Sequence, residues 1–245
     1  GEVDAPGPNL KVVTNANTTD PLMFDYRTGN YIFANKINVK VNDTLISQPF
    51  SIDSVGEVND VEVENSTHKY PIGMSIAIGS GKFKRTKMIT FTPKFIVVNK
   101  TDSEMNFKQF GSTTEFQVSQ NDTKSFFWTE KKLIAQMLSM KLDYTDWSVP
   151  FRIDNTGEVS LILKHTKKIA SKPRKKKTYV TVQMHSEMSI VYVVFELAQY
   201  PPYYIYNKTK HDLILGQHGV SGLFSLKANS KAPFSWPDQT RNHTM

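Results

Sequence analysis

An internal repeat constrains the fold of this chain more than any other feature. The segment from Thr92 to Gly111 recurs from Pro201 to Gly219 at a constant offset of 108, which maps Asn99 onto Asn207. The same register continues without a gap to the Phe-x-Trp pairs that end in Trp128 and Trp236. A period of this length indicates two copies of one domain-sized module.

A second block supports the repeat. QPFSIDSVGEV at 48–58 matches VPFRIDNTGEV at 149–159, at an offset of 101. The change of offset falls between the blocks, where connecting loops tolerate insertions. The sequence therefore predicts an arm over residues 1–22, a first repeat over 23–130 and a second repeat over 131–245.

The side-chain pattern predicts strands. Ile37 and Val39 alternate with polar residues, as in a strand with one buried face. The matching stretch, Leu133–Leu142, could also form an amphipathic helix, but its alignment with 36–41 favours a strand. Short segments rich in β-branched and aromatic residues, separated by Pro and Gly, predict an all-β fold of two tandem sandwich-like repeats.

Several repeated positions are predicted to be structural. In the PF-x-ID-x-x-GEV block, Asp53 with Gly56 and Asp154 with Gly157 take the first and fourth positions of a turn. This turn would lead from Phe50 and Ile52 into an antiparallel partner strand that begins at 58. Catalytic use of Asp53 and Glu57 is the less favoured alternative. Trp128 and Trp236 are predicted to pack in the core.

No constellation of catalytic or metal-binding residues is evident. The six His show no metal-ligand spacing, and the absence of Cys excludes disulfides and thiolate metal sites. We therefore predict a non-enzyme without cofactors, and a reducing compartment.

The net charge of +7 has a local origin, because eight basic residues lie between Lys164 and Lys177. The rest of the chain lacks the excess of basic residues that nucleic-acid binding requires, so no nucleic-acid partner is predicted. The simplest interpretation of the segment is a solvated hairpin loop. Contact with anionic lipid or a nuclear-import signal are the alternatives.

Asn99 and Asn207 each follow a predicted strand and precede Lys-Thr. An Asn in this position can bond backbone groups two residues on and fix a sharp corner. Both also belong to Asn-x-Thr sequons, of which the chain has seven. An extracellular β-sandwich glycoprotein with an unknown ligand is therefore the alternative function.

The repeated signatures WS-x-PF-x-ID-x-x-G, (F/Y)-I-(V/Y)-NKT and F-x-W resemble the adaptor-binding domain of the vacuolar protein sorting thirteen family of bridge-like lipid transfer proteins. The resemblance covers residues 23–245 and suits the last two of the family's six repeats. Trp147 has only Ile46 opposite it in the first copy, a departure from the pattern. The family's characteristic Asn maps to Asn99 and Asn207.

The resemblance implies capture of Pro-x-Pro motifs from organelle adaptors, and so targeting of a lipid transfer protein to membrane contact sites. It also implies a cytoplasmic, peripheral location at the membranes of endosome, mitochondrion or vacuole. Strand addition at an open sheet edge is the expected mode. The second copy is the better host because of its tyrosines, and the expected peptide-binding residues are Asn207, Tyr203, Tyr204, Tyr206, Leu215 and Gln217.

The arm contains a Pro-x-Pro sequence of its own, Pro6-Gly7-Pro8, followed by Leu10 and Lys11. We hypothesise that residues 1–13 are an adaptor peptide fused to the module, or a natural mimic of one, that occupies the binding site. Pro6, Pro8 and Leu10 are then the candidate bound motif. A Pro-rich tail without a binding role is the alternative.

Overall fold

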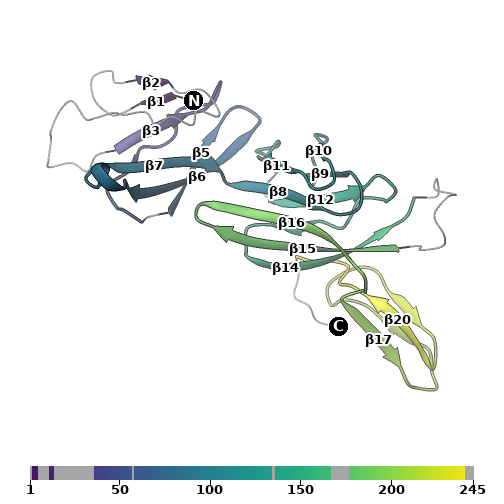
Figure 1. Ribbon diagram of the computed structural model, residues 1–245. Helices are drawn as coiled ribbons and strands as arrows, with labels where there is room; N and C mark the ends of the chain where they lie inside the picture. Colours follow the sequence, from purple (N-terminus) through teal and green to yellow (C-terminus); the bar gives the residue numbers. More distant parts are fainter. Residues whose placement is uncertain are drawn as a thin grey trace. The chain divides into compact units, whose positions relative to one another are not determined.

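The fold is seen in a computed structural model that describes residues 2–4, 11–13, 36–56, 58–133, 136–166 and 177–240. Among these residues every regular element is a strand except η1, one turn of 3-10 helix at Gly81–Phe83 (Figure 1). The prediction of an all-β, sandwich-like fold is confirmed.

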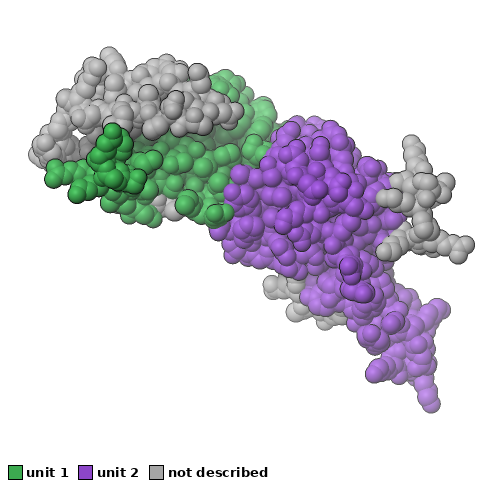
Figure 2. All heavy atoms as spheres, viewed as in Figure 1, with its two compact units in different colours: residues 1–95, 125–132, 187–191 green, residues 96–124, 133–186, 192–245 purple. Residues whose placement is uncertain are grey.

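The chain divides into two compact units (Figure 2). Unit 1 contains Gly1–Phe95, Ser125–Lys132 and Glu187–Val191, and unit 2 contains Ile96–Lys124, Leu133–Ser186 and Tyr192–Met245.

Unit 1 holds two sheets. The first has the order β2-β1-β3-β4 and the second the order β5-β6-β7. Ile37 of the first sheet and Met74 of the second belong to one buried cluster, so the two sheets share a core. The strands are β1 (Glu2–Asp4), β2 (Lys11–Val13), β3 (Lys36–Lys40), β4 (Phe50–Ser51), β5 (Val58–Glu64), β6 (Lys69–Ile78) and β7 (Lys87–Pro93).

The PF-x-ID block has a different role from the one predicted. β4 pairs with β3 and β5 pairs with β6, so the residues on either side of the turn do not form one antiparallel pair. The segment instead crosses from one sheet of the core to the other. Gly56 has φ +82°, a conformation that a side chain would strain, and its N–H donates to the carbonyl of Ile76 at 2.8 Å.

Unit 2 contains a complete sandwich. One sheet has the order β10-β9-β12-β13 and the other β11-β8-β16-β15-β14. Phe151 of the first packs edge-on against Phe195 of the second, with ring centroids 5.9 Å apart. The strands are β8 (Phe95–Lys100), β9 (Met105–Gln109), β10 (Phe116–Val118), β11 (Thr123–Phe126), β12 (Met137–Leu142), β13 (Phe151–Arg152), β14 (Gly157–Lys164), β15 (Lys177–Glu187) and β16 (Ile190–Ala198).

The strand alternative for Leu133–Leu142 is confirmed over 137–142. Leu138, Met140 and Leu142 of β12 are fully buried, and this alternation is the period of a strand. The sandwich draws β8–β11 from the first predicted copy and β12–β16 from the second.

The rest of unit 2 repeats only half of this sandwich. β17 (Tyr203–Asn207) pairs with β20 (Ser230–Phe234), as Figure 1 shows. β18 (Leu213–Leu215) pairs with β19 (Phe224–Leu226). At the offset of 108 these strands correspond to β8, β11, β9 and β10. We call β8–β11 the middle half-sandwich and β17–β20 the C-terminal half-sandwich.

Residues 2–4 and 11–13 of the predicted arm form strands. β1 pairs with β3 through Val3 and Val39, in the register in which β9 pairs with β12 through Phe107 and Met140. Val39 and Met140 are equivalent at the offset of 101. β1 thus takes the place at the first copy that β9 takes at the second.

Candidate functional site

The corner after β17 is organised by Asn207, which is 2 % exposed. Its Nδ2 donates to the backbone carbonyls of His211, Leu226 and Lys227 at 2.8, 3.1 and 2.9 Å. Its Oδ1 accepts from the N–H and the hydroxyl of Thr209 at 3.0 and 2.8 Å. The side chain therefore joins β17 to the start of β18 and the end of β19.

Asn99 builds the same corner in the middle half-sandwich. Its Nδ2 donates to the carbonyls of Ser103, Val118 and Ser119, and its Oδ1 accepts from the N–H and hydroxyl of Thr101. Every partner is displaced from that of Asn207 by the repeat offset. Both amides are fully engaged inside the protein, so any influence of Asn207 on a ligand acts through the corner it shapes.

The tyrosines of β17 point to both faces of the strand. Tyr203 is 49 % exposed but lies on the same face of the strand as Ile205 and Asn207, where it contacts the rings of Phe234 and Trp236, with centroids 6.3 Å away in each case. Tyr204 and Tyr206 are 45 % and 57 % exposed, and the Nζ of Lys231 lies 5.6 and 5.8 Å from their ring centroids. The two outward rings and Lys231 form a continuous cationic and aromatic surface.

Two ionisable side chains near this surface, Tyr179 and Asp212, have shifted pKa values. Burial raises the pKa of Tyr179, and the nearby charge of ionised Tyr204 raises it further. The N–H of Ala228 lowers the pKa of Asp212 by bonding its carboxylate, and Lys227 lowers it further.

Leu215 and Gln217 have separate environments. Leu215 is half-buried on β18. Gln217 is 3 % exposed, and its amide exchanges two hydrogen bonds of 2.9 Å with the backbone of Asp238. Gln217 therefore fixes the segment after β20, while Leu215 belongs to an apolar surface.

This apolar surface is the clearest difference between the two half-sandwiches. Val97, Met105 and Phe107 of the middle half-sandwich are fully buried. Their equivalents Ile205, Leu213 and Leu215 are only partly buried.

The difference follows from strand pairing. In the middle half-sandwich β8 pairs with β16 and β9 pairs with β12, whereas β17 and β18 each have one partner strand among the described residues. The C-terminal half-sandwich therefore presents open edges and a partly uncovered core. The sequence-based prediction did not include Ile205 and Leu213, because the repeat aligns them with the fully buried Val97 and Met105.

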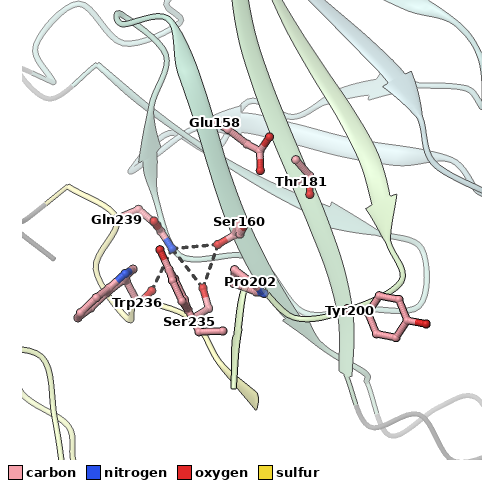
Figure 3. A pocket seen from close by; sticks show the side chains of 9 residues that line it. Glu158, Ser160, Thr181, Tyr200, Pro202, Ser235, Trp236 and Gln239 are labelled. Carbon is pink, nitrogen blue, oxygen red and sulfur yellow. Dashed lines mark hydrogen bonds between the residues drawn. The ribbon is translucent and has the colours of Figure 1, made fainter. Parts of the chain in front are cut away.

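A pocket of about 400 Å³ is lined in part by Tyr203. Figure 3 labels its other lining residues. One wall is fixed by Ser235 Oγ and Gln239 Nε2, which both donate to the carbonyl of Ser160 at 2.9 Å. Pro202, Tyr200 and Trp236 also line the space. The pocket therefore lies at the start of β17, whose first residue is Tyr203.

The remaining predicted residues fall in several places. Trp128 is 3 % exposed and contacts Phe95 and Phe126, and Trp236 packs edge-on against Phe234. Asp53 contacts Ser51 and Lys87, Asp154 pairs with Arg152, and Gly157 has φ +148°. Pro6, Pro8, Leu10 and most of the basic segment, residues 167–176, lie outside the described residues.

In the part of the chain that the structure describes, no group of three His, Asp or Glu residues could hold a metal ion. A search of the same residues finds no helix suited to cross a membrane.

The fold and the repeated corner define a module of tandem β-sandwich repeats. Comparison with known families places it further: the model for the vacuolar-sorting associated protein 13 adaptor binding domain matches residues 8–242. The chain belongs to this family of adaptor-binding domains. The family is one of binding domains, and its description indicates no catalytic activity.

Individual relatives agree with this assignment. The intermembrane lipid transfer protein vps13E of Dictyostelium discoideum is 22 % identical over 92 % of the chain, which spans 6 % of that protein. VPS13A of Mus musculus is 29 % identical over 39 % of the chain, and VPS13C of Homo sapiens is 28 % identical over 42 %. The chain spans 3 % of each of these two proteins.

Proposed function

We propose that the chain captures Pro-x-Pro segments of organelle adaptors by strand addition to the open edge of β17. The observation that carries the proposal is that, among the described residues, this edge of β17 has no partner strand. The equivalent edge of β8 is paired with β16, and the equivalent side chain Val97 is fully buried. An added strand would cover Ile205 in the same way.

The chemistry of Pro-x-Pro suits this edge. In an extended strand, residues i and i+2 direct their side chains to one face and their backbone groups to one edge. Proline has no N–H, so both prolines must face away from the partner strand, while the central residue bonds to β17. The free edge of the added strand then lacks donors, which would end the sheet after one peptide.

The aromatic side chains supply the contacts for the proline rings. Tyr204 and Tyr206 lie on the outward face, and Tyr203 with Trp236 lies on the inward face. Large, flat aromatic rings are the usual partners of proline in peptide recognition. Asn207 and Gln217 contribute by holding the corner and the segment after β20.

At the level of the whole protein, we infer that this capture targets a lipid transfer protein to membrane contact sites from the cytoplasm. The endosome, the mitochondrion and the vacuole are the candidate organelles. The basic segment Lys164–Lys177 would add contact with anionic lipid, at about 1 kcal/mol per basic residue near the membrane surface.

The test is the affinity of a fluorescent Pro-x-Pro peptide, measured by polarisation, against a peptide with both prolines replaced by Ala. We expect the double replacement to abolish binding. Tyr204→Ala should weaken binding, whereas Ile96→Ala, the matched change in the middle half-sandwich, should not. Equal affinity of the two peptides, or equal effects of the two variants, would contradict the proposal.

A further inference from the structure

The corner of the C-terminal half-sandwich differs in charge from the corner that it repeats. We compare residues 208–212 and 227–232 with their equivalents, 100–104 and 119–124. The C-terminal corner has four lysines and one acidic residue: Lys208, Lys210, Lys227, Lys231 and Asp212. The middle corner has two lysines and three acidic residues: Lys100, Lys124, Asp102, Glu104 and Asp122.

The backbone of the two corners is the same. Asn99 and Asn207 make equivalent hydrogen bonds, and Asn121 and Asn229 both have positive φ, at 59° and 51°. The charge difference therefore does not come from a difference in fold. The largest single change is Asp102 to Lys210, and Asp122 to Ser230 and Thr123 to Lys231 each add one positive unit beside the Asn corner.

In the middle corner the first lysine has an acidic partner from the neighbouring strand. Lys100 at the end of β8 pairs with Glu196 of β16, with Nζ and Oε1 3.1 Å apart. Lys208 has the same position on β17, where no described strand lies alongside the open edge. Within the described residues neither Lys208 nor Lys231 forms an ion pair, while Lys227 is paired with Asp212 at 3.3 Å.

Lys208 and Lys231 line a small pocket of about 240 Å³. Its other walls are Tyr206, Asn207, Asn229 and Ser230. Lys231 is held beside the rings of Tyr204 and Tyr206, and the hydroxyl of Ser230 donates to the carbonyl of Lys227 at 2.7 Å. Two ammonium groups that lack acidic partners among the described residues, at the end of a strand with an open edge, are suited to bind a carboxylate.

We propose that this pocket binds an acidic side chain, Asp or Glu, of the segment that adds to β17. The carboxylate pairs with Lys208 as Glu196 pairs with Lys100. This inference rests on the proposed strand addition, and it adds a specificity rule: a preferred adaptor carries an acidic residue near its Pro-x-Pro motif.

The direct test uses a small probe and its neutral isostere. N-acetyl-glutamate methylamide and N-acetyl-glutamine methylamide are titrated into the full chain, and the amide signals of Lys208, Asn229 and Lys231 are followed by NMR. We expect a saturable shift with the glutamate probe alone, which weakens in 0.5 M salt because the charges are exposed. Equal shifts with both probes, or no saturable shift with either, would overturn the proposal.

The repeat itself supplies a matched variant. Ser230→Asp with Lys231→Thr gives these two positions the residues of the middle corner, on a backbone that already holds them. We expect this variant to lose the response to the glutamate probe. The reciprocal change, Asp122→Ser with Thr123→Lys, should create a weaker response in the middle corner, where Glu196 still competes.

A peptide experiment separates this proposal from the proposed function. A Pro-x-Pro peptide with a flanking Glu is compared with one carrying Gln. We expect roughly two- to fivefold tighter binding of the Glu peptide, as for exposed ion pairs, and no difference in the Ser230→Asp, Lys231→Thr variant. If both peptides bind equally, the proposed acidic subsite is wrong and strand addition stands. If neither peptide binds while the glutamate probe does, strand addition is wrong and the acidic subsite stands.

Anionic lipid is the competing occupant. Sedimentation with phosphatidylserine vesicles that requires Lys208 and Lys231, together with no response to the glutamate probe, would show a lipid contact and overturn the peptide assignment. We expect the Ser230→Asp, Lys231→Thr variant to bind vesicles as the unchanged chain does.

Discussion

Asn207 and Thr209 are joined by two hydrogen bonds, one from the N–H and one from the hydroxyl of Thr209 to Oδ1 of Asn207. The hydroxyl donates to this oxygen at 2.8 Å and also lies 3.0 Å from the carbonyl of His211. Asn99 and Thr101 repeat the arrangement at 2.9 and 2.7 Å. The Asn-Lys-Thr sequence is thus a structural unit that folds the same corner twice.

Asn207→Ala should destabilise the C-terminal half-sandwich by about 1–3 kcal/mol, because three backbone carbonyls lose their donor in a buried corner. It should also weaken peptide binding, since the corner positions the end of β17. Urea unfolding and peptide affinity measure the two effects. Asn207→Asp is the control: it keeps the acceptor for Thr209 but loses the donors, and should be comparably destabilising. An unchanged midpoint together with unchanged affinity would refute the structural role.

The β17 tyrosines should separate into two groups. Tyr203→Ala removes contacts with Phe234 and Trp236 and should cost about 1 kcal/mol of stability. Tyr204→Ala and Tyr206→Ala change side chains on the opposite face of the strand and should alter stability by less than about 0.5 kcal/mol, while lowering peptide affinity. If all three variants changed only stability, the ligand would have to bind elsewhere.

Removing residues 1–13 tests the hypothesis that the arm is a bound adaptor peptide. β1 pairs with β3, so the deletion should lower the stability of unit 1 by about 1–3 kcal/mol through the lost strand hydrogen bonds. Affinity for a free Pro-x-Pro peptide decides the hypothesis. A several-fold increase would mean that the arm competes for the site, as a short tether would favour, whereas unchanged affinity would show that it does not.

Glycosylation should spare the two corner residues. Asn99 and Asn207 are 0 % and 2 % exposed, and every polar atom of their amides is engaged. Chain expressed through a secretory pathway and folded should carry no glycan at either residue by peptide mass mapping. A glycan at Asn207 on folded protein would contradict the corner described above.

The sequence predicted the repeat, the strands and the corner because these depend on local patterns that occur twice. It did not predict that β4 and β5 join different sheets, because a turn signal does not specify the partner of each strand. Nor did it reveal the partly uncovered Ile205 and Leu213. Their periodicity matches that of Val97 and Met105, and they differ because no strand of the described residues lies alongside them. Burial depends on pairing across the fold, which periodicity alone does not contain.

Hydrogen exchange of β17 tests strand addition most directly. The amides of Tyr203–Asn207 are followed with a Pro-x-Pro peptide and with its Ala-x-Ala control. The account predicts new protection on β17 with the proline peptide alone, with the equivalent strand β8 unchanged. Binding of the proline peptide without new protection on β17, or with protection confined to other strands, would contradict it.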